Sequence, residues 1–370
     1  MSIEGKPDFA TVWSVFKGAA LKPSTAALTI ALLVPSILFG LCLAFITPGL
    51  MASSTAAYFS SGAWDDYTDL TSHALAISFD HSDQPVVIIL GASDTRESIT
   101  NHAAITEIVH DRTGLRPVIY NLASSDQTFW EMAAIIDQIP ADRPAVIVMG
   151  LGAGRFSMSP GRLAELIDNP RLGFRSTIID DEAQRAGLVV PSRTDNYFLD
   201  NTEFFLSRLP QFMENVTTQH PRKRRYNLYL TSSKAPESRW QEFSGSIQAR
   251  FEKYQVNFDS NMSVLSRILG RLSDRPEQSA VFLVPPKNPR DVANGLWDEF
   301  YRTHLARLEE ISQDYDVPLW MLDDEIGIKE ADFYDASHLN DNDVQYRYTM
   351  LLAERIAALF ASTDQRETGS

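Results

Sequence analysis

The fold follows from one stretch of sequence, Val86-Val87-Ile88-Ile89-Leu90-Gly91-Ala92-Ser93-Asp94-Thr95-Arg96. Its first five residues are apolar and mostly β-branched, which predicts a short parallel strand buried on both faces. Small and polar residues follow, so Ser93 is expected on the turn between this strand and a helix. Open α/β folds bind ligands at the carboxyl edge of the sheet, and this turn places the serine hydroxyl there.

Strand and helix patterns alternate outward from this stretch. Further strands are predicted at 117–122, 145–151, 280–284 and 318–322, and helices at 99–112, 128–138, 297–315 and 346–360. Residues 160–275 interrupt the alternation without a clear buried strand, which predicts a helical insertion beside the active-site edge, where such insertions form lids. The predicted fold is therefore α/β, with a flavodoxin-like parallel sheet between two helical layers.

A second motif, Asp335-Ala336-Ser337-His338, follows the last predicted strand. Because both motifs follow strands of one parallel sheet, we expect them to meet at the same edge. His338 can then remove the proton from Ser93, while Asp335 orients the imidazole and stabilises its protonated form. Taken separately, each motif also fits a plain structural role, as a small-residue turn or as a helix cap. Their joint placement favours a Ser-His-Asp system.

Three stretches carry a resemblance to a known superfamily: Gly-Ala-Ser-Asp-Thr-Arg at 91–96, Tyr-Asn-Leu-Ala-Ser-Ser-Asp-Gln-Thr at 120–128, and Asp-Ala-Ser-His-Leu-Asn at 335–340. The pattern resembles the SGNH hydrolases. Within them it looks most like the membrane-anchored branch that includes the D-alanyl transfer protein of teichoic-acid D-alanylation and the accessory proteins of polysaccharide O-acetylation. The resemblance implies an SGNH-type three-layer α/β/α fold, acyl transfer, and a multi-spanning acyltransferase partner that brings the acyl group across the membrane.

The oxyanion-binding groups of that superfamily do not carry over. Typical members donate from the serine N–H, from a glycine N–H after the second strand and from an asparagine after the third. Here Ser124 and Ser125 occupy the second position, and the third contains Gly152 and Arg155 but no asparagine. The candidate donors are the serine N–H and a backbone N–H near the second position, with Gly152 and Arg155 as further candidates. Because nothing in the sequence fixes where the Arg155 side chain points, we interpret Arg155 as an ordinary loop arginine.

The N-terminal region predicts a membrane span. Residues 23–50 contain no charged side chain, and residues 26–46 are predominantly apolar. About 20 such residues cross a hydrocarbon core. A cleaved signal peptide is the alternative, but the apolar run is longer than a signal sequence requires. The only cysteine of the chain, Cys42, lies in the middle of the span.

Charges on either side of the span predict its orientation. Lys17 and Lys22 precede it, whereas Asp65 and Asp66 follow it and no Lys or Arg occurs again until Arg96. The positive-inside rule therefore places the N-terminus in the cytoplasm. The expected location is the inner (cytoplasmic) membrane, crossed once, with the catalytic domain in the periplasm or outside the cell.

The domain organisation follows from these features. We expect a cytoplasmic segment at 1–24, a transmembrane helix at 25–48, a connector at 49–80, the SGNH-like domain at 81–362 with its insertion at about 160–275, and a disordered tail at 363–370. A basic run at 220–225 is expected either to contact an anionic lipid or glycan or to form a solvated loop. The net charge of −15 argues against nucleic-acid binding.

The predicted function is acylation of a polysaccharide. The chain is expected to be a membrane-anchored serine acyltransferase in the O-acylation, foremost O-acetylation, of a cell-envelope or secreted polysaccharide. An esterase that removes acyl groups with the same triad is one alternative, and a non-catalytic glycan-binding or scaffold subunit is another. No cofactor or metal is expected: Asp341 and Asp343 lack the EF-hand pattern and are interpreted as capping the final helix.

Overall fold

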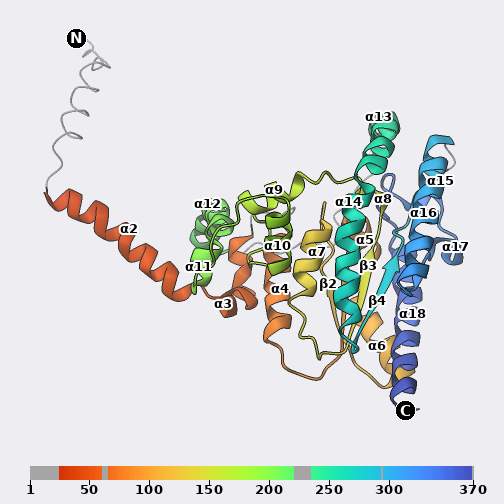
Figure 1. Cartoon of the computed structure of the whole chain (residues 1–370), viewed down its shortest axis with the longest axis horizontal. Coiled ribbons are helices and arrows are strands. Elements are labelled where there is room, and N and C mark those ends of the chain that lie inside the picture. The colour runs from red at the N-terminus through yellow and green to blue at the C-terminus, as the bar shows by residue number, and fades with distance from the viewer. Residues whose placement is uncertain (1–24, 61–65, 221–234, 293–294, 369–370) are drawn as a thin grey trace, which may run out of the picture.

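The computed structural model describes residues 25–60, 66–220, 235–292 and 295–368 (Figure 1). Some predictions fall at least partly outside these ranges, including the connector at 49–80 and the insertion at 160–275. The cytoplasmic segment at 1–24, the basic residues 221–225 and the last two residues of the predicted tail lie outside the described residues.

A five-stranded parallel sheet forms the centre of the domain. Its strands are β1 (Val86–Leu90), β2 (Val118–Asn121), β3 (Ala145–Gly150), β4 (Gln278–Leu283) and β5 (Leu319–Trp320). They pair in the order β2-β1-β3-β4-β5, and every pair is parallel. This is the flavodoxin-like order, which reverses direction between β1 and β3 and opens a crevice there. The prediction of an α/β fold with a parallel sheet is confirmed.

Burial on both faces explains why the central strands are continuous apolar runs. Every residue of β1 and of β3 is buried. Because side chains alternate along a strand, Val86, Ile88 and Leu90 join the core on one face, and Val87 and Ile89 join the core on the other.

Helices cover both faces of the sheet. The face of Val87 is covered by α6 (His102–Thr113) and by α18 (Asn342–Thr368), which also pack on each other. The opposite face is covered by α4 (Tyr67–Phe79), α7 (Phe129–Ile136), α14 (Ile247–Ser273) and α16 (Gly295–Asp314). Figure 1 shows α7 and α14 running alongside the strands. The result is the predicted three-layer arrangement.

The remaining elements are short or lie outside these layers. Before the sheet come α2 (Thr25–Phe45), α3 (Pro48–Ala52) and the 3-10 helix η1 (Ser54–Phe59). At the carboxyl edge of the sheet lie α5 (Ser93–Ser98), α8 (Ala153–Phe156), α15 (Pro289–Val292), α17 (Asp323–Ile326) and the 3-10 helix η2 (Glu330–Asp332). Between β3 and β4 also come α9 (Arg162–Asp168), α10 (Thr177–Arg185), α11 (Tyr197–Asp200), α12 (Thr202–Thr218) and α13 (Glu237–Gly245).

Three predicted boundaries need correction. The segment 49–80 is not only a connector, because α4 buries Leu70, Ala74 and Ile77 at helical spacing in the core. The predicted insertion at 160–275 includes α14, which packs on β4 and α7 and therefore belongs to the layer that covers the sheet. The predicted tail is helical as far as Thr368, where α18 ends.

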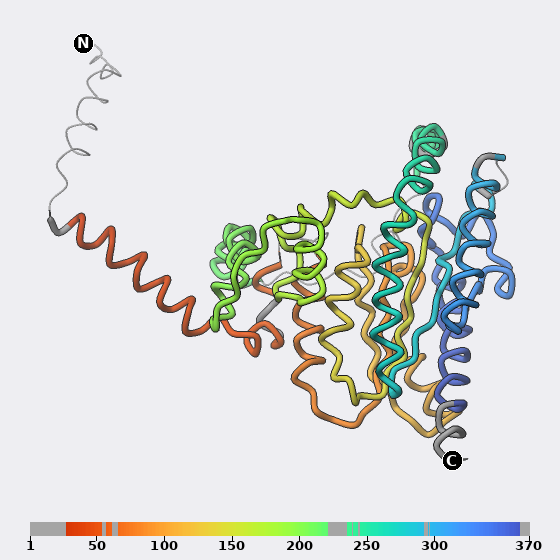
Figure 2. The backbone as a smooth tube through the Cα atoms, viewed as in Figure 1, coloured from red at the N-terminus to blue at the C-terminus, as the bar shows by residue number. Residues whose placement is uncertain are grey.

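Within the part of the chain that the structure describes, one helix is long and apolar enough to cross a membrane. It comprises 19 residues, Ala27–Phe45, none of them fully buried, although Cys42 and Leu43 near its end pack partly against the domain. Figure 2 shows α2 extending away from the folded domain as a separate rod. This finding agrees with the predicted span in position and length.

Candidate active site

The strand-to-helix turn places Ser93 at the carboxyl edge of the sheet. Ser93 is the first residue of α5, three residues after β1 ends. Gly91 has a φ of 151°, and a Cβ at that position would lie 2.5 Å from the Thr95 hydroxyl oxygen. A Cβ on Gly150, at the end of β3, would overlap the same threonine. The two glycines therefore let α5 press closely against the ends of β1 and β3, at the point where the strand order reverses.

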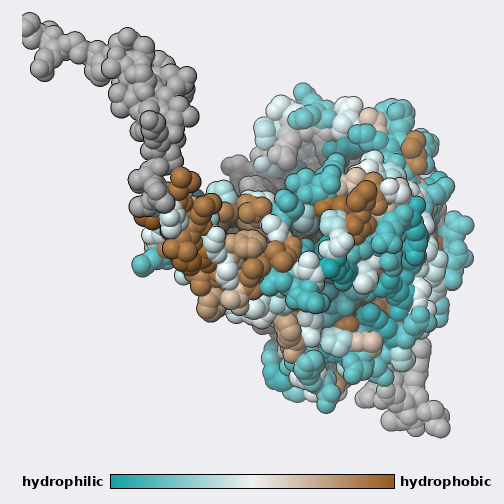
Figure 3. All heavy atoms as spheres, turned by 60° about the vertical axis from the view of Figure 1, so that its left-hand side comes forward, coloured by the Kyte–Doolittle hydropathy of each residue, from teal (hydrophilic) through white to brown (hydrophobic). Residues whose placement is uncertain are grey.

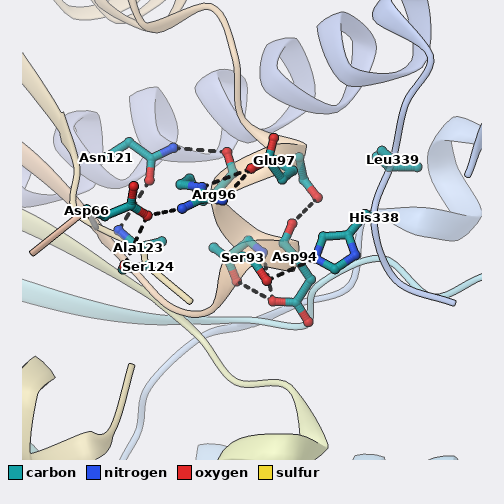
Figure 4. Close-up of polar contacts among 12 residues, drawn as sticks. Asp66, Ser93, Asp94, Arg96, Glu97, Asn121, Ala123, Ser124, His338 and Leu339 are labelled. Carbon is teal, nitrogen blue, oxygen red and sulfur yellow. Dashed lines mark hydrogen bonds and ion pairs between the residues drawn. The ribbon is translucent and has the colours of Figure 1, made fainter. Parts of the chain in front are cut away.

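His338 and Asp335 meet this serine. The His338 Nε2 atom lies 2.9 Å from the Ser93 Oγ atom, and Figure 4 shows the hydroxyl directed at the imidazole ring. The Nδ1 atom of the same ring lies 2.8 Å from Asp335 Oδ1. Because an ionised carboxylate can only accept, Nδ1 carries the proton and Nε2 is left to accept from the serine. The three predicted residues are thus joined in the order Ser-His-Asp.

The hydrogen bonds around Asp335 keep its carboxylate ionised. Burial alone would raise the pKa of Asp335, but the His338 ring and the backbone N–H groups of Ser337 and His338 outweigh it, so the pKa lies below its usual value. These N–H groups donate to Asp335 Oδ1 at 3.1 and 3.0 Å. Ionised Asp335 can therefore hold the imidazole in one orientation and stabilise its charged form.

Hydrogen bonds hold the segment that carries Asp335 and His338 against the loop after β4. The Asn288 amide N–H donates to the Ala336 carbonyl at 3.1 Å, and the Asn288 side chain donates to the Asp335 carbonyl at 3.2 Å. Tyr334 N–H also donates to the His338 carbonyl at 2.8 Å. Asn288 is fully buried. The loop after β4 thereby fixes the segment that presents the imidazole to Ser93.

Ser124 is not placed as an oxyanion donor, which corrects one prediction. Its N–H donates to the Gly91 carbonyl at 2.9 Å, and its hydroxyl donates to Asp66 at 3.1 Å. Ser124 is fully buried, so both groups hold the turn together. Ser125 is also tied down, because its carbonyl accepts from the Tyr67 hydroxyl at 3.1 Å. No hydrogen bond within the described residues places Ser125 beside the Ser93 hydroxyl.

Asp126, the next residue, is a position that the sequence analysis missed. Its φ is 50°, a left-handed conformation that is uncommon for a residue with a side chain, and it lines the same cavity as Ser93. Arg171 holds this backbone by donating to the Asp126 carbonyl at 2.8 Å. Strained backbone of this kind clusters at functional sites. With this left-handed conformation, the backbone N–H groups next to Asp126 point in other directions than they would in a right-handed turn. No sequence pattern indicated this conformation.

Gly152 lies beside Ser93, whereas Arg155 is not in a loop as the sequence analysis favoured. Gly152 lines the cavity beside Ser93, and a Cβ there would lie 3.2 Å from Asp94 Oδ2. Arg155 is in α8 and is 2% exposed, so it is neither a loop arginine nor part of the cavity wall. Within the described residues its guanidinium nitrogens have no hydrogen-bonding partner. Burial lowers the pKa of Arg155, which Asp94 and Glu131 partly oppose.

A cavity of about 510 Å³ opens beside the Ser93 hydroxyl. One wall is aromatic and comes from α16, which contributes Trp297, Phe300 and Tyr301. Trp297 and Phe300 stack with ring centroids 5.9 Å apart and an interplanar angle of 20°. The cavity lining also carries charges of both signs. Its charged residues are Asp94, Asp126, Arg250, Lys287 and Asp291.

Lys287 forms an ion pair next to the nucleophile. Its Nζ atom lies 3.3 Å from Asp94 Oδ2, and both side chains are largely buried. Burial acts to raise the pKa of Asp94, but Lys287 and Arg155 outweigh it and keep this pKa below its usual value. The residue that follows Ser93 is therefore an ionised carboxylate with a cation beside it, in the lining of the cavity.

Buried charges also hold the helix that carries Ser93. Arg96 and Asp66 are 1% and 0% exposed and form an ion pair, and Arg96 Nε donates to Glu97 Oε1 at 2.9 Å (Figure 4). Asp66 immediately precedes α4, and Asn121 ends β2 and donates to the Arg96 carbonyl at 3.3 Å. This network joins α4, α5 and β2 directly behind Ser93.

A prediction follows for Asp291, which is 6% exposed and lines the cavity. Burial raises its pKa to about 6 although Lys287 and Arg290 lower it. Below about pH 4 the Asp291 carboxyl is protonated in both the folded and the unfolded state, so its burial costs little. As the pH rises to 6 and above, the folded state must bury a charged carboxylate, which lowers the free energy of unfolding. We expect Asp291→Asn to raise the free energy of unfolding at pH 7 by about 1–3 kcal/mol and to change little at pH 4.

Denaturant titrations of the full chain between pH 4 and 7 measure this difference. An Asp291→Asn variant that is less stable than wild type at every pH would mean that the carboxylate makes a favourable contact. Asp324→Asn is a suitable control, because Asp324 is exposed and lies outside the cavity lining. It should shift stability by the same small amount throughout this range.

Most of the cavity wall was beyond sequence analysis. Lys287 follows β4, as a ligand-binding residue at a sheet edge does, but a single lysine after two prolines carries no motif. Trp297, Phe300 and Tyr301 lie on a helix whose amphipathic pattern indicates only packing. Among the described residues, no cluster of three or more His, Cys, Asp or Glu side chains is arranged to hold a metal ion.

Comparison with known proteins adds no relative to this geometry. No model of a known protein family matches the chain, and no curated protein matches it at a significant level. The likeness to SGNH hydrolases therefore rests on the three sequence stretches, and the candidate site on the arrangement of its side chains.

Proposed function

We propose that this chain is a membrane-anchored, SGNH-like serine acyltransferase that acts in the O-acylation of a cell-envelope or secreted polysaccharide. One observation carries the proposal: the Ser93 hydroxyl, the His338 ring and the Asp335 carboxylate are joined by hydrogen bonds of 2.9 and 2.8 Å beside an open cavity. A serine with a purely structural role would have no need of an imidazole held in this way.

The geometry supports a two-step reaction. His338 Nε2 takes the proton as Ser93 Oγ attacks the acyl carbonyl, and the resulting oxyanion collapses when the donor's leaving group takes that proton back. The acyl group is then an ester of Ser93. An acceptor hydroxyl attacks this ester after giving its proton to His338, and the serine recovers a proton as the product ester leaves. If water attacks instead, the products are the free acid and the same regenerated enzyme.

The serine N–H and the Gly152 N–H are the proposed oxyanion donors. Both residues line the cavity, and Ser93 begins α5, where backbone N–H groups lack an intrahelical acceptor. Loss of one donor costs about a hundred- to a thousandfold in other acyl-transfer enzymes. The sequence after β3 has no asparagine that could act as a third donor. The Lys287 ammonium, which lies in the cavity wall and donates to Asp94, can supply positive charge near the oxyanion instead.

The aromatic wall supports a sugar as acceptor. Trp297 of α16 is partly exposed in the cavity and is backed by the buried ring of Phe300. A sugar ring can pack its C–H face on such an aromatic side chain while charged lining groups bind its hydroxyls. A cavity that holds an acceptor also excludes water from the acyl-serine, which favours transfer over hydrolysis. Removal of acyl groups by the same three residues is the alternative reaction, since it uses the same intermediate.

The proposed location is the inner membrane, with the domain on the periplasmic or extracellular side. The apolar helix Ala27–Phe45 supports the membrane anchor, and the absence of Lys and Arg for the next fifty residues supports the orientation. Such a location gives the domain no direct access to cytoplasmic acyl donors. We therefore propose that a multi-spanning acyltransferase partner supplies the acyl group, as the SGNH-like resemblance implies.

The partition between transfer and hydrolysis tests this function. We expect full-length protein in detergent, given 4-nitrophenyl acetate and a panel of neutral and acidic oligosaccharides, to form acetylated sugar at the expense of free acetate. Trp297→Ala should raise the KM for the acceptor roughly five- to thirtyfold, the effect of losing about 1–2 kcal/mol of aromatic contact. It should leave ester cleavage without acceptor almost unchanged.

Trp297→Phe is the matched variant and should restore most of the acceptor binding. Release of acetate at one rate with every sugar, together with no effect of Trp297→Ala, would favour the esterase. If Ser93 and His338 variants retained sugar binding and the wild type showed neither reaction, a glycan-binding subunit would be the better account.

A further inference from the structure

We propose that α12 lies on the membrane surface, with one apolar face in the lipid next to the outer end of α2. This face consists of Leu206, Leu209, Met213 and Val216 and is called the α12 stripe below. The proposal goes beyond the acyl-transfer function and rests only on the proposed membrane span.

The α12 stripe is exposed in the folded chain. Its four side chains are 51%, 47%, 53% and 45% exposed. Successive members are three, four and three residues apart, a spacing that gathers them on one side of a helix. The adjoining side of α12 is buried and includes Phe204, Phe205, Arg208 and Asn215. A helix with one face in the core and a second apolar face open to solvent requires a second apolar environment.

Contacts between α11 and α2 set the height of this region. The rings of Phe198 and Phe39 meet edge to face with centroids 6.0 Å apart, and the Asn196 side chain donates to the Leu43 carbonyl at 3.1 Å. Phe39 precedes Phe45, the last residue of α2, by six residues, which is about 9 Å along a helix axis. If Ala27–Phe45 fills a hydrocarbon core about 30 Å thick, then α11 touches the span below the level of the headgroups.

The position of α12 is fixed relative to that contact. α11 ends at Asp200, and α12 begins at Thr202. Phe205 and Phe212 of α12 both pack on Phe59 of η1, with centroids 5.4 and 4.6 Å from its ring. The Asn215 side chain donates to the backbone of Tyr58 and Ser60. The α12 stripe is therefore held close to the outer end of the span and cannot rotate away without breaking these contacts.

The surface around α2 and the charges of α12 indicate lipid as the occupant. In Figure 3 the brown atoms of α2 continue onto brown and tan atoms at the adjoining end of the folded domain, without an intervening band of teal. The charged side chains of α12 that are exposed, Glu203 and Glu214, are both acidic and lie off the stripe. Binding through apolar burial, without attraction to anionic headgroups, is the expected mode.

Fluorescent probes on the full-length protein test the proposal. In a Cys42→Ala background, Leu209→Cys and Met213→Cys are each labelled with an environment-sensitive dye and reconstituted in phosphatidylcholine vesicles. We expect both probes to be quenched several-fold more by a lipid with a shallow acyl-chain quencher than by aqueous iodide. Glu214→Cys, on the same helix but off the stripe, should show the reverse order, and adding anionic lipid should change neither.

Two further outcomes separate the possible failures. A probe at Leu33→Cys reports on α2 itself. If it is lipid-quenched while the stripe probes are quenched by iodide like Glu214→Cys, the span is correct and the stripe proposal is wrong. If Leu33→Cys is also open to iodide, the span fails and the stripe proposal fails with it, whereas the chemistry of Ser93 is untouched. Stripe probes shielded from both quenchers would mean that protein covers the stripe, which overturns lipid as its occupant.

Discussion

Replacing Ser93 with alanine is expected to lower kcat for cleavage of a small acetyl ester by roughly ten-thousandfold or more, because the covalent intermediate can no longer form. The Ser93 hydroxyl donates to His338 Nε2, with the two atoms 2.9 Å apart. His338→Ala should cost a similar factor, since nucleophile and base act as one unit.

Ser157→Ala is the matched control for this prediction. Ser157 lines the same cavity, but its hydroxyl donates to the Ala153 carbonyl at 3.1 Å and does not contact the imidazole. We expect this variant to stay within a few-fold of wild type. A Ser93→Ala enzyme that keeps a tenth of the wild-type turnover would show that another group performs the chemistry.

Replacing Arg96 with alanine is expected to cause the largest loss of stability. Its guanidinium is 1% exposed and pairs with Asp66 and Glu97, which are both fully buried. Removing the cation leaves two carboxylates in the interior without it, and breaking a buried ion pair in this way costs about 3–5 kcal/mol. The free energy of unfolding of the full chain, from denaturant titration, measures the effect.

Arg112→Ala provides the comparison. Arg112 pairs with Glu354 at 3.0 Å, but both side chains are about half exposed, at 62% and 46%. An exposed pair of this kind contributes about 0–1 kcal/mol. Equal losses from the two substitutions would mean that the network behind Ser93 does not support α5.

The sheet could be predicted because each central strand is a short, continuous apolar run in the sequence. β1 and β3 are buried on both faces, so only apolar residues fit there and the runs stand out in the sequence. The Ser93 and His338 motifs also lie beside strand ends, where parallel topology brings them to one edge. The region of α4 was expected to be a connector or a short helix leaving the membrane. Its place in the core escaped prediction, because only the structure shows Leu70 and Ile77 buried there.

Hydrogen-bond partners decided what sequence could not. Ser124 was a reasonable oxyanion donor by position, but its N–H is used by the Gly91 carbonyl. The left-handed backbone of Asp126 depends on Arg171, 45 residues further along the chain, and no local pattern reveals such a contact. Arg155 was interpreted as a loop residue because sequence shows no direction; its burial behind the cavity comes from the packing of α8.

Labelling with a serine-directed phosphonate is the most direct test of the central claim that Ser93 is an activated nucleophile. The full-length protein in detergent is treated with the reagent, and the modified residue is located by peptide mass spectrometry. We expect an adduct on Ser93 that is lost in both Ser93→Ala and His338→Ala and kept in Ser157→Ala. A folded wild-type protein that remains unlabelled, or a label that persists in His338→Ala, would contradict the role of Ser93 as the nucleophile.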